Sequence, residues 1–318
     1  MRALILAAGL GTRLRPLTYL RAKAAIPVNG MPLVRRIVRQ LAAQGFNDLV
    51  INLHHHPATI TGLMGDGSDL GVRLRYSWEQ PVLGSAGGPR HALPLLVDDD
   101  NPRARFLLVN GDTLTDADLR GLVRAHEEAG DAAVTMALIP NPEPMKYGGV
   151  SVRDGRVTGF TRAGSQEPTY HFIGLQVVET RAFAALTDGK PMESVNQVYP
   201  RLLAEEPRAI CAYISEASFQ DIGSPADYLR TSLALADVEG SQMHGARLRV
   251  DPSATVTRTA LWDDVTVGAG AHLDTAIVGD GAVVPAGATY TRCVILPDDG
   301  RTPMQRERVE NGLLIAPF

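Results

Sequence analysis

The residues best suited to chemistry lie near the start of the chain. Gly9, Gly11 and Thr12 follow a short apolar run, and the cations Arg13 and Lys23 come soon after them. Glycine lets a backbone come close to an anion, and fixed cations beside exposed amides bind phosphate groups. No Gly-Lys-Ser/Thr follows the turn and the spacing is not G-x-G-x-x-G, which excludes a P-loop and a dinucleotide fingerprint. The stretch therefore predicts a polyphosphate site of another type.

An acidic residue ends a later apolar run. Residues 106–112 have the composition of a buried strand, and the last of them is Asp112. A carboxylate at the carboxyl end of a strand can hold Mg²⁺, which keeps most of its water and takes one or two carboxylates plus phosphate oxygens. We therefore predict that Asp112 is a metal ligand. Asp116 lies nearer the amphipathic stretch 118–129, and we predict that it caps this helix.

Strand and helix patterns alternate around these residues, and they must position them. The predicted strands are residues 3–7, 49–53, 72–76, 106–112, 133–139 and 170–178, with an edge strand at 210–214 and a hairpin that turns at 154–155. The predicted helices are residues 32–45, one ending near 96, 118–129, 194–203 and 225–237. Strands joined through helices favour right-handed parallel crossovers. The pattern predicts an α/β fold with a Rossmann-like mixed, mostly parallel sheet.

A different period begins near residue 250. Large apolar residues recur about every six positions, with small residues and glycines between them and with two slips of one residue. They are Val250, Val256, Trp262, Val267, Leu273, Val278, Val284, Tyr290 and Leu296. Such a period is typical of a parallel β-helix that buries one apolar residue per side in its axis. We predict a catalytic domain at 1–238, a short β-helix of about two to three coils at 239–300, and a tail at 301–318 whose apolar end docks on the protein.

Composition excludes several classes of partner. The chain has 318 residues, 45% of them hydrophobic, and a formal net charge of −4 with the charges mixed along its length. No basic patch indicates binding to nucleic acid or to an anionic membrane, and no apolar run approaches the length of a membrane span. Cys211 and Cys293 are far apart and outside any metal-ligand spacing. We expect a cytoplasmic protein without a disulfide framework.

The run Gly9-Leu-Gly-Thr-Arg-Leu-Arg-Pro-Leu-Thr18, with Lys23 behind it, resembles the signature of the sugar-1-phosphate nucleotidyltransferases. Asn110-Gly-Asp112 and the segment around Asp221 resemble two further motifs of that family. Two departures stand out. Ala22 and Ala24 flank Lys23 where the family usually has prolines, and Thr161-Arg-Ala163 stands where it commonly has Glu-Lys-Pro, so the acidic sugar contact is missing.

The resemblance implies a reaction and a set of site residues. A sugar 1-phosphate oxygen attacks the α-phosphorus of a nucleoside triphosphate (NTP), with Mg²⁺ as cofactor, and pyrophosphate leaves. The implied catalytic residues are Arg13 and Lys23, and the implied metal ligands are Asp112 and Asp221. The implied nucleotide-binding residues are Leu6, Ala8, Gly9, Gly11, Thr12, Glu79, Gly84, Ser85 and Asn110. Gly148, Arg162 and Gly174 are implied to bind the sugar phosphate, and the β-helix to be left-handed.

Glu79 allows two interpretations. An ionised carboxylate only accepts hydrogen bonds, which suits the adjacent N1–H and N2–H groups of guanine better than the mixed edge of uracil or thymine. This favours GTP. The alternative is a solvated loop carboxylate with no ligand. Both remain open at the level of sequence.

Within the family, the motifs are most similar to those of the mannose-1-phosphate guanylyltransferases, so GTP and mannose 1-phosphate are the favoured substrates. The alternative is a uridylyltransferase for N-acetylmuramate 1-phosphate or another hexose 1-phosphate. An alternative of another class is a catalytically silent regulatory subunit that binds sugar nucleotides. An acyltransferase built on the β-helix is excluded because the repeat array is short. The β-helix could also assemble a homo-oligomer.

Overall fold

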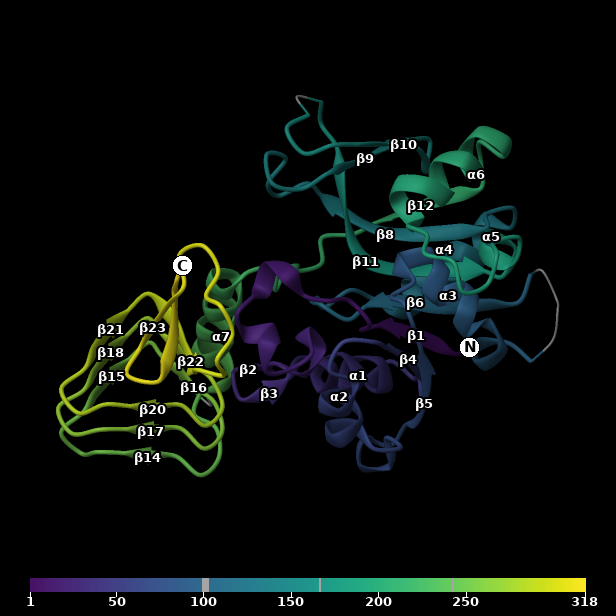
Figure 1. The fold of residues 1–318 in the computed structure, drawn as a ribbon. Helices are drawn as coiled ribbons and strands as arrows, with labels where there is room; N and C mark the ends of the chain where they lie inside the picture. Colours follow the sequence, from purple (N-terminus) through teal and green to yellow (C-terminus); the bar gives the residue numbers. More distant parts are fainter. Residues whose placement is uncertain (99–102, 166, 242) are drawn as a thin grey trace. The chain divides into compact units, whose positions relative to one another are not determined.

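The apolar run that begins at Ala3 forms a central strand of a nine-stranded sheet. The strand order is β5 (Arg73–Trp78), β4 (Asp48–Leu53), β1 (Ala3–Leu6), β6 (Arg105–Asn110), β11 (Tyr170–Glu179), β8 (Val134–Pro140), β12 (Ile210–Ile214), β10 (Arg156–Thr161) and β9 (Gly149–Arg153). Within this sheet, β11 and β10 run against the other strands. The predicted mixed α/β sheet is confirmed (Figure 1).

The computed structural model describes residues 1–98, 103–165, 167–241 and 243–318. Their contacts define a first unit of Met1–Gly9, Ile37–Pro57 and Met64–Gln220, and a second unit of Leu10–Arg36, Ala58–Leu63 and Asp221–Phe318. The loop that carries Arg13 and Lys23 therefore belongs to the same unit as the C-terminal strands. These units do not follow the predicted boundaries at 238 and 300, which stay a prediction.

Helices and short connecting elements complete the chain. The helices are α1 (Leu33–Ala43), α2 (Pro57–Met64), α3 (Gly84–Leu96), α4 (Leu119–Ala129), α5 (Arg181–Ala184), α6 (Tyr199–Glu205) and α7 (Pro225–Glu239). The single-turn segments are η1 (Thr12–Leu14), η2 (Leu17–Tyr19), η3 (Lys23–Ala25), η4 (Ser68–Leu70) and η5 (Ser194–Val198), and the short strands are β2 (Pro27–Val28), β3 (Met31–Pro32), β7 (Thr113–Leu114) and β13 (Gln220–Asp221).

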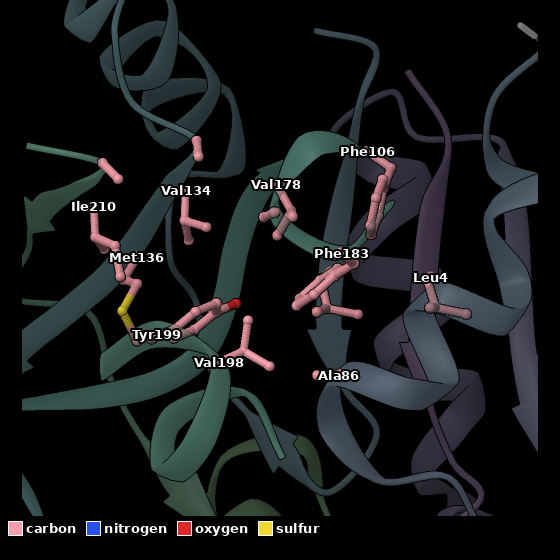
Figure 2. Close-up of a cluster of buried hydrophobic side chains, with 14 of the residues drawn as sticks. Leu4, Ala86, Phe106, Val134, Met136, Val178, Phe183, Val198, Tyr199 and Ile210 are labelled. Carbon is pink, nitrogen blue, oxygen red and sulfur yellow. The ribbon is translucent and has the colours of Figure 1, made fainter. Parts of the chain in front are cut away.

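One large cluster of the core of the first unit lies on one face of the nine-stranded sheet. Successive strand residues point to opposite faces, so Val134 and Met136 of β8 share a face. Figure 2 shows them in one cluster with Phe183 of α5 and Tyr199 of α6. The rings of Phe183 and Tyr199 stack with centroids 6.2 Å apart. Short helices thus supply the aromatic rings that fill the space above the strands.

Two predictions about the first unit were wrong. Asp118, and not Asp116, caps α4, because its Oδ1 accepts a hydrogen bond from Gly121 N at 2.8 Å. The carboxylate of Asp116 instead accepts a hydrogen bond from Ser218 N. Strand β12 is an interior strand between β8 and β10, and not an edge strand. Pairing with β10 supplies the ladder that the sequence of β12 alone did not reveal.

The C-terminal strands wind as a parallel coil. Their three stacks are β14 (Arg249–Val250), β17 (Thr266–Val267) and β20 (Val283–Val284); β15 (Thr255–Thr257), β18 (His272–Asp274) and β21 (Thr289–Thr291); and β16 (Ala260–Leu261), β19 (Ile277–Val278) and β22 (Cys293–Pro297). Hydrogen bonds link positions 17 residues apart on successive coils. We call residues 249–297 the coiled β-region (Figure 1). The hand of its winding stays a prediction.

The 17-residue repeat explains the slips in the six-residue pattern. Three sides of six residues would need eighteen, so each coil is one residue short. The third apolar column consists of Leu261, Val278 and Ile295, which pair in register. Trp262 and Leu296 were predicted in the axis, but each lies one position beyond this column and outside the cluster that fills the axis.

The apolar end of the tail docks, as predicted. Strand β24 (Leu313–Pro317) pairs antiparallel with β22 and with β23 (Arg308–Glu310). Leu313, Leu314 and Ile315 are buried. Among the residues that the structure describes, no helix is long and apolar enough to cross a membrane.

The hydroxyl of Tyr199 provides a test of the core. It donates a hydrogen bond to Gln176 Oε1 at 2.7 Å, and both side chains are buried. Tyr199→Phe leaves this acceptor unsatisfied, and we expect a loss of about 1–3 kcal/mol in the free energy of unfolding, measured in urea. The control is Tyr76→Phe, which removes a hydrogen bond to Gly65 O at the surface and should cost about 0.5 kcal/mol or less. Equal losses would contradict the proposed role of burial.

Candidate active site

The first unit gathers polar residues at one edge of its sheet. Strands β5, β4, β1 and β6 are parallel neighbours, so their carboxyl ends meet at the same edge. Glu79 follows β5, Asn52 lies near the end of β4, Ala7 and Ala8 follow β1, and Asn110 ends β6. Leu6 is paired with both Asn52 and Asn110. This edge is where an α/β sheet of this kind places a ligand.

A buried amide organises this edge. Asn52 Oδ1 accepts hydrogen bonds from Ala7 N at 2.6 Å and from Ala8 N at 3.2 Å. Asn52 Nδ2 donates to Glu79 Oε1 at 2.7 Å. Glu79 Oε2 in turn accepts from Leu83 N at 2.7 Å. The network connects the start of the first glycine-rich loop to the start of the second, so the two loops are fixed together.

The burial of Glu79 rules out one of its two interpretations, that of a solvated loop carboxylate. Its side chain is 4% exposed, so it is not a solvated loop carboxylate. Burial raises the pKa of this carboxyl, and the hydrogen bonds from Leu83 and Asn52 act against that rise. A Cβ on Gly88 would lie 2.5 Å from Glu79 Oε1, so α3 needs glycine there. Both carboxylate oxygens already accept hydrogen bonds from the protein, which favours a bracing role over a contact with guanine.

Gly84 and Ser85 begin α3 and are held by a neighbouring loop. The Ser85 hydroxyl donates to Glu193 Oε2 at 2.6 Å and accepts from Ser194 N at 2.9 Å. Gly84 has a positive φ of 76°, and a Cβ there would lie 2.8 Å from Met192 O. These contacts fix the loop at the start of α3. The nucleotide-binding role of both residues stays a prediction.

Asn110 and Gly174 lie side by side. A Cβ on Gly174 would lie 2.7 Å from Asn110 Cβ, so the absence of a side chain makes room for Asn110. The implied role of Gly174 in binding the sugar phosphate stays a prediction. Gly174 also lies within an irregularity of β11. Asp112 follows at the end of β6 and is half-buried.

The cationic loop forms a pocket within the second unit. Gly11, Thr12, Arg13 and Lys23 line a space of about 180 Å³ together with Gly223. Gly11 is left-handed, with φ 61°, and a Cβ there would lie 2.6 Å from Thr18 Cγ2 and 3.4 Å from Lys23 Cβ. Glycine is therefore required for the turn to close against Thr18. The structure brings together the cations that the sequence placed ten residues apart.

Asp221 lies beside this pocket. A Cβ on Gly223 would lie 2.8 Å from Asp221 Oδ2 and 3.3 Å from Arg13 Nη1, so glycine leaves room for both side chains. Among the described residues, no three His, Cys, Asp or Glu side chains gather as a metal site. The predicted metal ligands, Asp112 and Asp221, are carboxylates, and carboxylate oxygens are hard ligands. This donor set fits Mg²⁺, which takes few protein ligands.

A second pocket, of about 620 Å³, lies in the first unit. Gly148 and Arg162, which we predicted to bind the sugar phosphate, both line it, and Gly174 is not among its lining residues. Thr161 Oγ1 and His171 Nδ1 also line it and are buried with no hydrogen-bond partner. Burial lowers the pKa of His171, so its ring is neutral over a wider pH range. Polar side chains thus line this pocket together with the rings of Phe160 and Phe172.

Sequence reasoning missed several of these residues. Asn52 had a signal, because it is a polar residue within an apolar strand run. His171 and Asn196 line the second pocket but come from β11 and η5, which are far apart in sequence. Glu193 gave no signal, because an exposed carboxylate in a loop has no distinctive pattern. These residues became visible only through their contacts.

Comparison with known proteins identifies the class of this site. A family described as nucleotidyl transferase matches residues 2–238, and the chain belongs to this family. It is therefore an enzyme that transfers a nucleotidyl group. The resemblance of its motifs to the sugar-1-phosphate nucleotidyltransferases is confirmed.

Particular relatives cover most of the chain. The chain is 30% identical to the mannose-1-phosphate guanylyltransferase of Mycobacterium tuberculosis over 303 residues, which are 91% of this chain and 83% of that protein. It is 27% identical to a UTP–glucose-1-phosphate uridylyltransferase of Synechocystis, over 84% of this chain and 72% of that one. The crystal structure of HddC from Yersinia pseudotuberculosis has a similar fold, with a TM-score of 0.62, 21% identity, and coverage of 74% of this chain and 99% of that one.

The buried carboxylate predicts a dependence of stability on pH. The pKa of Glu79 is raised above its ordinary value of 4.5, so its contribution to stability is full below that pH and is lost as the pH rises through the folded-state pKa. Glu79→Gln carries no charge. We therefore expect the variant to gain stability relative to the wild type as the pH rises from about 4 to 8.

Urea unfolding at a series of pH values measures this difference. Glu128→Gln is the matched control, because Glu128 is exposed and its variant should track the wild type at every pH. A difference between Glu79→Gln and wild type that does not change with pH would show that the buried carboxylate carries no cost.

Proposed function

We propose that this protein transfers a guanylyl group from GTP to mannose 1-phosphate and releases pyrophosphate. The observation that carries this proposal is the relative from Mycobacterium tuberculosis, which is named for this activity and covers 91% of the chain. The pocket that contains Arg13 and Lys23 supplies the cations that such a transfer needs. We prefer this activity to others in the family because of that relative.

The residues of the loop act by position and charge. Arg13 neutralises the leaving β- and γ-phosphates, and Lys23 neutralises the charge that develops on the α-phosphate in the transition state. The backbone of Gly11 and Thr12 lets the phosphates come close to both cations. No covalent intermediate with the protein is required, because the sugar phosphate oxygen attacks directly and in line. Catalysis is therefore mainly orientation and charge neutralisation.

Asp112 and Asp221 would be the ligands of a magnesium ion, which would further neutralise phosphate charge when bound. Both carboxylates are half-buried; Asp112 lies between β6 and β7, and Asp221 is the last residue of β13. The acceptor sugar is assigned to the pocket of about 620 Å³ that is lined by Gly148 and Arg162. Arg162 holds the phosphate of the sugar there, because a guanidinium binds phosphate through two parallel hydrogen bonds.

A second candidate is uridylyl transfer to glucose 1-phosphate. It is favoured by the Synechocystis relative, which is named for that activity and is 27% identical over 84% of this chain. The bracing role of Glu79 also weakens the argument from its carboxylate toward guanine. The base and the sugar must therefore be determined by assay.

The deciding assay measures pyrophosphate release with Mg²⁺ across a grid of substrates. The grid pairs GTP, UTP, dTTP and ATP with the 1-phosphates of mannose, glucose, N-acetylglucosamine and N-acetylmuramate. We expect the highest kcat/KM with GTP and mannose 1-phosphate. A higher value with UTP and glucose 1-phosphate would select the second candidate. Release with no pair, while sugar nucleotides still bind, would indicate a regulatory subunit instead.

Lys23 provides a test of the assigned chemistry. Lys23→Met removes the cation that neutralises the α-phosphate in the transition state, and we expect kcat to fall by about 100- to 1,000-fold with thermal stability preserved. The matched control is Lys190→Met, an exposed lysine outside the pocket, which should retain full activity. A Lys23→Met enzyme with wild-type kcat would remove lysine from the mechanism.

A further inference from the structure

Arg21 connects the cationic loop to the coiled β-region. Its Nε donates to Asp280 Oδ2 at 2.7 Å, and its Nη2 donates to Asp280 Oδ1 at 2.6 Å and to Asp263 Oδ2 at 2.8 Å. The arginine side chain is 15% exposed. A guanidinium fork fixes a carboxylate in direction as well as in distance. The contact therefore fixes the orientation of the arginine, and does not merely attract it.

The two aspartates form a built acceptor for this arginine. They lie at equivalent positions of successive coils, 17 residues apart, and Asp280 Oδ1 also accepts a hydrogen bond from Asp263 N. Asp263 Oδ1 accepts from Ala246 N at 2.8 Å. A backbone N–H group of the coil thus donates a hydrogen bond to each of the two carboxylates that bind Arg21. The positions of both carboxylates are therefore set by the coil itself.

An apolar row beside the aspartates faces the same segment. Trp262 and Leu296, which were predicted in the axis but lie one position beyond its third column, belong to this row with Gly279 between them. Trp262 packs under the guanidinium of Arg21, with 5.3 Å from its Cζ to the ring centroid. A Cβ on Gly279 would lie 2.8 Å from Leu20 Cδ1 and 2.4 Å from Leu296 Cδ2. Trp262, Gly279 and Leu296 therefore form a surface against which residues 20 and 21 pack, and we call it the Trp262 surface.

Hydrogen bonds connect the Trp262 surface to β2, the strand that follows the loop. Trp262 Nε1 donates to the Tyr228 hydroxyl at 3.0 Å, and that hydroxyl donates to Pro27 O at 2.7 Å. Both rings are nearly fully buried. Ala22 N, next to Arg21, donates to Thr59 Oγ1 at 3.1 Å. The chain is thus held on both sides of Lys23, which begins the turn η3.

We propose that the coiled β-region positions the Lys23 turn for nucleotidyl transfer, with Arg21 as the positioning residue. The proposal rests on the role given to Lys23 under the proposed function. Ala22 and Ala24 flank Lys23, and alanine leaves the backbone freer than proline would. Arg21 therefore adds a restraint from outside the loop to the turn hydrogen bonds within it, which run from Ala25 N to Ala22 O and from Ile26 N to Lys23 O.

The test uses the full chain with three variants. Arg21→Gln removes the charge, and Arg21→Lys keeps it without the fork. Arg247→Gln is the matched control, because Arg247 makes a similar two-pronged ion pair with Asp264 on the same coils but is exposed. Two quantities are measured for each variant: steady-state kinetics with the best substrate pair, and hydrogen exchange of the amides in residues 20–28.

We expect Arg21→Gln to lower kcat by about 10- to 100-fold with little change in KM, because a small displacement of a catalytic group acts on the transition state. Exchange in residues 20–28 should rise. Arg21→Lys should recover part of kcat, which also keeps the test decisive if Arg21→Gln folds poorly. Arg247→Gln should match the wild type in both measurements.

Three results would overturn the proposal. These are unchanged exchange in Arg21→Gln, an unchanged kcat in that variant, or an equal loss of kcat in Arg247→Gln. The exchange measurement does not depend on the reaction. If the wild type turned over no substrate pair while exchange rose in Arg21→Gln alone, the role of Arg21 in ordering residues 20–28 would be confirmed and the proposed function would fail.

Discussion

The hydrogen bonds of one buried amide hold the candidate site of the first unit together. Asn52 accepts from two backbone N–H groups after β1 and donates to Glu79, whose other oxygen accepts from Leu83 N. Backbone donors buried without partners are costly, and an unpaired buried carboxylate costs more. Each member therefore depends on the others. The two glycine-rich loops can keep their conformations because this network satisfies the polar groups where both of them start.

The second unit solves a different problem, which is to hold cations close together. Arg13 and Lys23 repel each other, and the loop that carries them contains a left-handed glycine and three single turns. Turn hydrogen bonds, such as Ala25 N to Ala22 O, give this loop some order of its own. The coiled β-region is rigid because each coil pairs with the next along three stacks. Arg21 joins the loop to this frame, and under the proposed function this contact would help to order the backbone that carries the neutralising cations.

The pocket of the first unit bears on the choice of substrate. Its described lining residues include Arg162, a neutral imidazole and an amide, but no carboxylate. Under the proposed function, sugar hydroxyls would be recognised there by backbone groups and by the side chains of Asn196, Thr161 and His171. The absence of the family's Glu-Lys-Pro motif thus agrees with the absence of a carboxylate among the described residues that line this pocket.

The sequence alone was enough to predict the mixed α/β sheet, the cationic glycine-rich loop and the six-residue repeat, because each depends on local spacing. Contacts between distant segments could not be read in this way. The bracing role of Glu79 depends on Asn52 and Leu83, and the interior place of β12 depends on β10. The capping of α4 is local, but two aspartates precede the helix, and the structure decided which of them caps its first turn. Trp262 looked like one more core residue of the repeat. Its place beside Arg21 was decided by a coil of 17 residues, because the missing eighteenth turns that side chain away from the axis.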